Sequence, residues 1–203
     1  GKDRRTEIIY DEIEEVEEVE EIPDYPVHLF FTRDGYFKKI TPLSLRMGGE
    51  QKLKEGDELV SIVETTNKAE LLFFTDKCQV YKSRASDFED SKASVLGDFV
   101  PSKLQFEADE KPLCMIVTTD YSGFMMFFFE NGKAAKVNMQ GYDTKTNRKK
   151  LIKAYSDKAP LVSAFYLKED AEFVLTSTAG RVLLVNTGAI SIKTTKDTAG
   201  VNV

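Results

Sequence analysis

Hydrophobic residues occur in short runs separated by turns, and one arrangement of run, turn and run is found four times. The first copy covers residues 29–40, where an apolar run, an Asp-Gly pair and a second run of apolar and basic residues follow one another. The other copies cover residues 72–83, 127–137 and 174–185. The equivalent turn positions are Gly35, Cys78, Gly132 and Gly180, which lie 43, 54 and 48 residues apart. A period of about 40 to 50 residues is typical of one blade of a propeller-like β array.

Each copy has the composition of a β-hairpin. Asp34-Gly35 and Asn131-Gly132 are strong hairpin signals, because a two-residue turn that matches strand twist needs positive φ, which Gly and Asn tolerate. Ala179-Gly180 is a weaker match. The flanking aromatic and aliphatic residues suit a pleated, half-buried surface. Since one hairpin cannot bury its face alone, the pattern predicts an all-β fold in which several hairpins stack or form a ring.

The repeats predict an acidic leader, residues 1–24, and one domain of about four blades, residues 25–203. The expected blades are residues 25–67, 68–119, 120–170 and 171–203. The first three are expected to close on strands at residues 59–64, 113–117 and 161–167. The fourth stops at Val203 without such a strand, so we expect the chain to be cut from a longer protein.

Cys78 occupies a turn position that is glycine in the other three copies. A residue other than glycine is strained at positive φ. We therefore expect blade two to use a different turn, with Lys77 or Asp76 absorbing the change.

The net charge of −6 is unevenly distributed along the chain. Residues 1–24 contain three basic and eleven acidic side chains, a charge of −8, which leaves +2 for the remainder. The repeat domain is thus slightly basic, and the acidity of the whole chain does not argue against nucleic acid. The leader itself allows two interpretations, a disordered or extended linker and a helix, because its glutamates would repel one another on a helical face.

Several classes of function find no support in the sequence. No apolar run approaches the roughly 20 residues of a membrane span, and the charged N-terminus is unlike a signal peptide. Cys78 and Cys114 are expected to be reduced thiols of a cytoplasmic protein. His28 is the only histidine, so neither a catalytic triad nor a multi-histidine metal site can form. We expect no catalytic residue, metal or cofactor in this chain, and we expect Phe124, Phe127, Phe128 and Phe129 to form blade core rather than a base-stacking surface.

Several short motifs follow one another in a specific order. They are Arg4-Arg5-Thr6-Glu7-Ile8, an acid-rich connector, Thr-Arg-Asp-Gly-Tyr-Phe-Lys-Lys at residues 32–39, Glu55-Gly56-Asp57, and Leu-Phe-Phe-Thr at residues 72–75 with Val80-Tyr81. This order resembles the A subunits of bacterial type IIA topoisomerases, the family of DNA gyrase and topoisomerase IV. The first motif resembles the end of the breakage-reunion core, and the rest resembles the C-terminal DNA-binding repeat domain.

The resemblance implies a β-pinwheel, a propeller-like disc whose blades exchange strands and whose basic rim bends duplex DNA. It also implies three partners in the bacterial cytoplasm, namely duplex DNA, an ATPase B subunit, and the rest of the A subunit to which such a domain belongs. The family's nicking tyrosine lies in a core that this chain lacks. We therefore expect the chain to bind DNA as part of a topoisomerase and not to catalyse a reaction on its own.

One family motif is degenerate. The A subunits of gyrases carry a basic box of the form Gln-Arg-Arg-Gly-Gly-Lys-Gly in the first-blade loop, and the matching residues here are Leu-Arg-Met-Gly-Gly-Glu-Gln at positions 45–51. Arg46, Gly48 and Gly49 are kept, whereas Glu50 replaces the lysine. This departure makes DNA wrapping doubtful and favours a protein like topoisomerase IV or a divergent paralogue.

A lysine also recurs at one position of the repeat, as Lys39, Lys82 and Lys136, with Leu184 in the fourth copy. A ring of such cations would meet DNA phosphates without reading bases. The alternative is that these lysines are strand residues that protect blade edges. The candidate DNA-binding residues are Lys39, Arg46, Lys52, Lys82, Arg84, Lys136, Arg148, Lys149, Lys150, Arg181 and Lys193.

Two functions from different classes remain open. The first is a DNA-binding and DNA-bending module, in which the acidic leader suppresses binding by lying over the basic rim. The second is a propeller-like protein-interaction scaffold that acts through its acidic leader.

Overall fold

The computed structural model describes residues 21–146, 148–176 and 179–203 as a succession of antiparallel β-sheets. The first sheet has the strand order β3-β1-β2-β6 and the second the order β10-β5-β4-β7. The third has the order β11-β8-β9-β14, and β12 pairs with β13 in a fourth. Residues 1–20, which make up most of the predicted leader, lie outside the described residues, so neither interpretation of the leader is tested.

Each sheet is built around one of the predicted hairpins. The hairpin strands are β1 (Pro26–Thr32) with β2 (Tyr36–Ile40), β4 (Glu70–Thr75) with β5 (Val80–Arg84), β8 (Phe124–Phe129) with β9 (Lys133–Asn138), and β12 (Glu172–Thr176) with β13 (Val182–Asn186). The strands predicted to close the first three blades are present as β3 (Leu59–Thr66), β7 (Pro112–Thr118) and β11 (Leu161–Leu167). Each pairs with the first strand of its own hairpin.

The outermost strand of each of the first three sheets comes from the blade that follows it. These strands are β6 (Asp98–Phe99), β10 (Lys150–Leu151) and β14 (Val201–Asn202), which pair with β2, β5 and β9. Successive blades are therefore linked through backbone hydrogen bonds as well as through side chains. The fourth sheet contains only β12 and β13 within the described ranges.

Short helices lie in the loops between the sheets. The α-helices are α1 (Pro42–Met47) and α2 (Val100–Lys103). The 3-10 helices are η1 (Ala85–Asp87), η2 (Met139–Tyr142) and η3 (Thr187–Ala189), each of which begins directly after the second strand of a hairpin. None of the described helices is long and apolar enough to cross a lipid bilayer.

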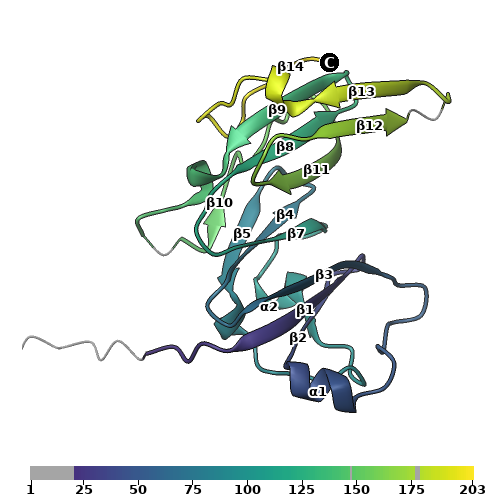
Figure 1. The fold of residues 1–203 in the computed structure, drawn as a ribbon, viewed down its shortest axis with the longest axis vertical. Helices are drawn as coiled ribbons and strands as arrows, with labels where there is room; N and C mark the ends of the chain where they lie inside the picture. Colours follow the sequence, from purple (N-terminus) through teal and green to yellow (C-terminus); the bar gives the residue numbers. More distant parts are fainter. Residues whose placement is uncertain (1–20, 147, 177–178) are drawn as a thin grey trace, which may run out of the picture.

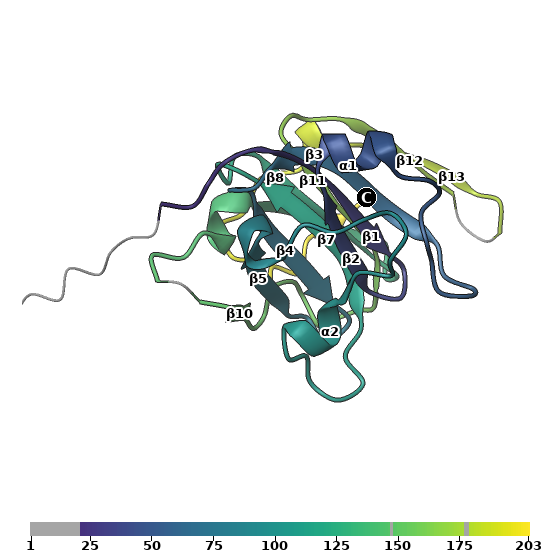
Figure 2. The ribbon, with the colours of Figure 1, turned by 90° about the horizontal axis from the view of Figure 1, so that it is seen from below.

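The sheets stack along the long axis of the molecule. Figure 1 shows the β1-β2-β3 sheet at one end, the β12-β13 sheet at the other and the two remaining sheets between them. In Figure 2, which looks along that axis from below, the sheets overlap one another. The order of the blades in space thus follows their order in the sequence.

Apolar side chains fill the spaces between consecutive sheets. Phe31, Phe37 and Phe73 belong to a buried cluster shared by the first two blades, and Phe74 and Phe127 to one shared by the second and third. Smaller clusters under the β1-β2 hairpin and between the last two blades complete the described core. All six residues of β8 are buried, which confirms the prediction that its phenylalanines form core. Because each large cluster needs two blades, no blade buries its apolar face alone.

The turn at Cys78 differs from our prediction. Gly35, Gly132 and Gly180 have φ of 104°, 77° and 78°, and Cys78 itself has a φ of 55°. The prediction that Lys77 or Asp76 would absorb the change is therefore wrong. A non-glycine residue in this conformation costs roughly 1–2 kcal/mol, and the neighbouring backbone offsets this cost. The amide of Thr75 donates to the carbonyl of Gln79 at 2.9 Å, and the amide of Ala154 donates to the carbonyl of Cys78 at 2.9 Å.

Candidate nucleic-acid interface

The repeated lysines connect one blade to the next. Lys39 lies on β2 with its side chain 2% exposed. Its Nζ donates to Asn67 Oδ1 at 2.7 Å and to the carbonyl of Ala85 at 3.0 Å, and it lies 3.6 Å from Asp90 Oδ1. All three partners come from the loop and 3-10 helix around the next hairpin.

Lys136, on β9, makes the equivalent contact between blades three and four. Its Nζ donates to Asp170 Oδ1 at 2.7 Å and to the carbonyl of Thr187 at 3.1 Å, and it lies 4.5 Å from the centre of the Phe124 ring. Ala85 and Thr187 are the first residues of η1 and η3, so both lysines bind the same point of the following blade.

Lys82 is less completely enclosed. Its Nζ donates to Thr144 Oγ1 at 3.1 Å and lies 5.2 Å from the centre of the Tyr121 ring. Partial burial lowers the pKa of Lys82 below its usual range. The ammonium groups of Lys39 and Lys136 are buried and hydrogen-bonded to protein, which favours the structural alternative for these two residues over a phosphate-binding role.

Basic side chains instead gather in a groove of about 580 Å³ on blade two. The groove lies beside the β4-β5 hairpin, the end of α2 and the segment that leads to β10. Its lining residues are Glu70, Lys82, Ser83, Arg84, Asp87, Lys103, Leu104, Gln105, Thr144, Lys145, Thr146 and Lys149. Three separate parts of the chain therefore meet here, two of them in segments that flank the exchanged strands β6 and β10.

The groove has an excess of positive charge. Five of its lining residues are basic and two, Glu70 and Asp87, are acidic. Glu70 Oε1 lies 3.9 Å from Arg84 Nε. Asp87 Oδ2 accepts hydrogen bonds from the backbone amide of Arg84 at 2.8 Å and from Ser83 Oγ at 3.0 Å. Five basic side chains against two acidic ones leave the lining with a charge of +3, so the groove is attractive to an anionic ligand.

Two of these lysines were not among the candidate residues. Lys145 lies in the loop of blade three that also carries Arg148 and Lys149, and Lys103 follows the exchanged strand β6. The Nζ of Lys103 lies 4.7 Å from the centre of the Phe88 ring, which holds it beside the groove. Only knowledge of the strand exchange would have shown that Lys103 and Lys149 face the same space.

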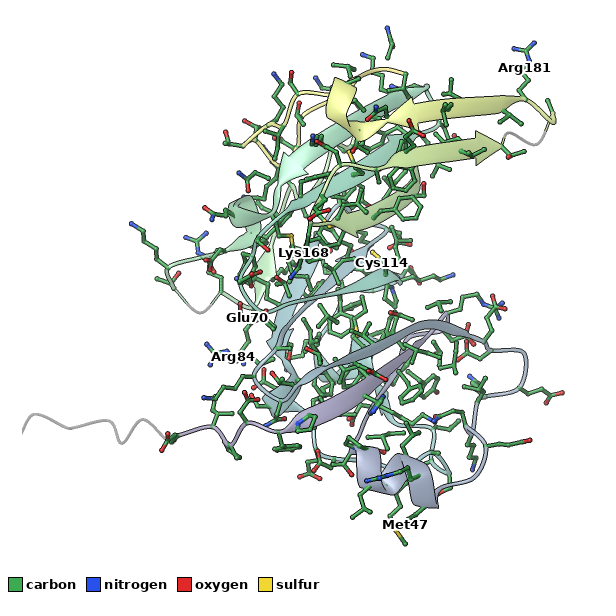
Figure 3. The ribbon with its side chains drawn as sticks, viewed as in Figure 1. Met47, Glu70, Arg84, Cys114, Lys168 and Arg181 are labelled. Carbon is green, nitrogen blue, oxygen red and sulfur yellow. The ribbon has the colours of Figure 1, made fainter. Side chains whose placement is uncertain are left out.

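The other candidate residues lie apart from the groove. Lys150 Nζ pairs with Glu107 Oε1 at 3.0 Å, and Arg148 is exposed next to Lys149. Arg46, Lys52, Arg181 and Lys193 are exposed on other blades. Figure 3 shows Met47, the neighbour of Arg46, at one end of the molecule and Arg181 at the other, with Glu70 and Arg84 between them. Of the candidate residues, the groove contains Lys82, Arg84 and Lys149.

The degenerate box and the helix before it expose apolar side chains and carry little positive charge. Arg46 lies in the last turn of α1, and the amide of Gly48 caps this helix by donating to the carbonyl of Ser44 at 2.9 Å. Leu43 and Met47 are 62% and 80% exposed. The first-blade loop therefore presents few cations near the positions where the gyrase box would supply them.

No group of three or more potential metal ligands is present among the described residues. Within the same residues, Cys78 and Cys114 are free thiols. Burial raises the pKa of the Cys114 thiol to about 12, so this thiol stays protonated at neutral pH.

Hairpins in succession, each of the first three completed by a strand from the next blade, define the fold as a β-pinwheel. No family model matches the chain. The comparisons with curated proteins and solved structures identify the A subunits of DNA gyrase and topoisomerase IV as its relatives, and their C-terminal domains as the proteins that share its fold. The resemblance inferred from the motif order is thereby confirmed.

The similarity is distant but covers most of the chain. The chain is 24% identical over 191 residues to the DNA gyrase A protein of Mycoplasma genitalium, covering 90% of this chain and 23% of that protein. It is 27% identical over 170 residues to the DNA topoisomerase 4 A protein of Staphylococcus aureus, covering 81% of this chain and 21% of that protein. The crystal structure of the C-terminal domain of a DNA topoisomerase IV superposes with a TM-score of 0.77 at 23% identity, covering 90% of this chain and 58% of that one. The chain thus spans less than a quarter of the length of these curated relatives.

Proposed function

We propose that this chain is the DNA-binding and DNA-bending module in the A subunit of a bacterial type IIA topoisomerase, and that it contacts duplex phosphates through the blade-two groove. Strand breakage would belong to the catalytic core of that subunit, and ATP hydrolysis to a B subunit, so the chain itself would not be an enzyme. Its partners would be duplex DNA and those two parts of the enzyme, in the bacterial cytoplasm.

The observation that carries this proposal is the convergence of Lys82, Arg84, Lys103, Lys145 and Lys149 on one groove. Duplex DNA carries one negative charge per roughly 1.7 Å of helix axis, so a cluster of cations meets several phosphates at once. Lysine contacts of this kind position DNA without reading its sequence. A domain that acts on DNA topology needs this kind of contact, because its substrate has no fixed sequence.

The degenerate box limits how far the DNA would be bent. Smoothly bending 20–30 base pairs by 40–90° costs on the order of 1–6 kcal/mol, which phosphate contacts must offset. The first-blade loop supplies Arg46 and Lys52 but also Glu50. We therefore propose bending at the groove without tight wrapping around the whole domain.

Salt-dependent binding to linear duplex DNA tests the proposed function. The test variant is K103Q/K145Q/K149Q, and the matched control K54Q/K111Q/K158Q removes three exposed lysines outside the groove. The logarithm of the affinity should fall with the logarithm of salt concentration, with a slope of about 0.9 per phosphate contact. The test variant should lose up to about 2.7 of that slope, and the control should lose much less.

Equal slopes for the test and control variants would show that the groove is not the interface. If the unchanged chain bound DNA with an affinity that does not depend on salt, binding through phosphates would be contradicted. That outcome would favour the protein-interaction scaffold.

A further inference from the structure

We propose that the acidic leader docks through its residues 11–20 into the blade-two groove of its own molecule and competes there with DNA. This inference rests on the proposed function, because it names the segment that regulates the same site. It commits to one occupant of the groove, the seven acidic side chains of residues 11–20, and to docking within one chain.

The leader joins the folded domain beside the groove. Asn67 Nδ2 donates to the carbonyl of Pro23 at 2.8 Å, and the backbone amide of Lys68 donates to Asp24 Oδ1 at 3.3 Å. The Tyr25 hydroxyl donates to Asp90 Oδ1 at 2.8 Å. The first two contacts fix Pro23 and Asp24 on the turn that precedes β4, and the third holds Tyr25 beside the segment that follows η1.

The groove begins two residues further along that turn. Glu70 lines it, and the carbonyl of Ala69 accepts a hydrogen bond from the amide of Ala85 at 2.9 Å, which places Arg84 next to the same point. In Figure 3, Glu70 and Arg84 lie on the side of the molecule from which the described N-terminal segment leaves the fold. The leader therefore starts at one end of the basic groove.

Charge and tether length match this placement. Residues 11–20 contain seven acidic side chains and no basic one, and the groove has five basic side chains against two acidic ones. Ten residues of random coil span about 17 Å end to end, so a leader of this length can bring its carboxylates to the groove. Tethering holds them at millimolar effective concentration, which compensates for the weakness of each screened contact.

The test uses the full chain and a full-length variant in which every acidic residue from 11 to 20 is changed to its amide, D11N/E12Q/E14Q/E15Q/E17Q/E18Q/E20Q. The first readout needs no DNA. A carbodiimide that joins carboxylates to amines at zero length is applied, and the linked peptides are mapped by mass spectrometry. Links from residues 11–20 should form to Lys103, Lys145 and Lys149, should disappear in the amide variant, and should remain when Lys54, Lys111 and Lys158 are replaced.

The second readout is DNA affinity. At low salt the amide variant should bind linear duplex DNA about five- to tenfold more tightly than the unchanged chain, a size usual for coupling between sites. The gain should shrink as salt rises, because screening weakens the leader's contacts. In the K103Q/K145Q/K149Q background the gain should vanish, whereas a general effect of net charge would persist there.

Each possible result decides between the two proposals. Absence of links to the three groove lysines, or equal DNA affinities in a chain that still binds DNA, overturns the leader inference and leaves the proposed function standing. Links that join only two different copies, detected with a mixture of isotope-labelled and unlabelled chains, overturn docking within one molecule. If neither chain binds DNA but the groove links form, the proposed function fails and the docking is retained.

Discussion

Lys39 and Lys136 show how a lysine side chain can be buried inside a repeat protein. Each ammonium group donates to a backbone carbonyl of the next blade and to a polar side chain in the turn before it. Removing the ammonium group would take away the bond that crosses between blades, although the Ala85 and Thr187 carbonyls also accept from the amides of Phe88 and Ile190. The lysines therefore act as clamps between blades, and they recur because the blade-to-blade contact recurs.

The substitution Lys39→Met tests this contact, because methionine keeps an unbranched apolar stem but has no ammonium donor. Asn67 Oδ1 would be left without its donor, and the Ala85 carbonyl would keep only the hydrogen bond from the amide of Phe88. The free energy of unfolding should therefore fall by about 1–3 kcal/mol. Chemical denaturation measures this change. DNA affinity of the folded variant should stay unchanged, and a selective loss of affinity without loss of stability would restore the phosphate-contact interpretation.

The sequence reveals such residues but not their partners. The recurrence of Lys39, Lys82 and Lys136 was visible, whereas Asn67 and Ala85 are 28 and 46 positions from Lys39 and carry no signal of their own. At Cys78 the sequence led to a wrong expectation. Residues other than glycine disfavour positive φ, but the backbone hydrogen bonds made by Thr75 and Ala154 hold Cys78 in that conformation.

At the scale of the elements, the exchanged strand β10 joins blades two and three. Lys150 and Leu151 pair with Tyr81 and Val80 of β5, and Leu151 is buried in the core shared by the two blades. A two-residue strand forms too few backbone hydrogen bonds to persist alone. Its position depends on the leucine side chain beneath it.

Leu151→Ala should therefore weaken two blades at once. Truncation of a buried leucine costs about 2–5 kcal/mol, and hydrogen exchange should quicken at backbone amides of β5 and of the segment around residue 151. The neighbouring Ile152 is 65% exposed, so Ile152→Ala provides a matched control with little expected effect. Destabilisation confined to blade three would contradict the role of β10 as a link.

The long strands could be predicted and the short ones could not. Hairpin residues at 29–40 and 127–137 combine apolar runs with Gly turns, and these signals are local. Strands β6, β10 and β14 have two residues each, which is too short for any periodicity to appear. The predicted blades at residues 25–67 and 68–119 were closed units, so the exchange itself followed only from the family resemblance.

At the scale of the whole molecule, buried and partly buried tyrosines in the first three blades couple stability to alkaline pH. Partial burial, together with the hydrogen bond to Asp90, raises the pKa of Tyr25 to about 12. Burial also raises the pKa values of Tyr81, Tyr121, Tyr142 and Tyr155. The folded chain thus keeps phenol protons that the unfolded chain releases near pH 10.

The sign of the effect follows from this difference. The contribution of a phenol whose folded pKa is raised is fully present below about pH 10 and is lost as pH rises toward the folded pKa. Burial lowers the pKa values of Lys38, Lys39 and Lys82, which acts in the opposite direction. The stability difference between the unchanged chain and Tyr25→Phe isolates one phenol. That difference should shrink above about pH 10 in denaturation experiments, and a constant difference would show that Tyr25 ionises alike in both states.

The fold and the relatives of the whole molecule could be predicted from motif order, but the groove could not. Arg84 and Lys149 were both candidates, yet 65 positions separate them in the sequence. They meet because β10 pairs with β5. A local motif cannot encode that proximity, since it arises from the exchange of strands between blades.

Strand exchange also constrains how such a protein changes in evolution. Each of the first three sheets receives one strand from its successor, so a deletion inside a repeat that takes out the donated strand damages the sheet of the blade before it. Duplication or loss of one full repeat avoids this damage, because every repeat then still donates one strand and receives one. Lineages should therefore gain and lose blades in whole repeats, while insertions accumulate in the loops between a hairpin and the strand it donates.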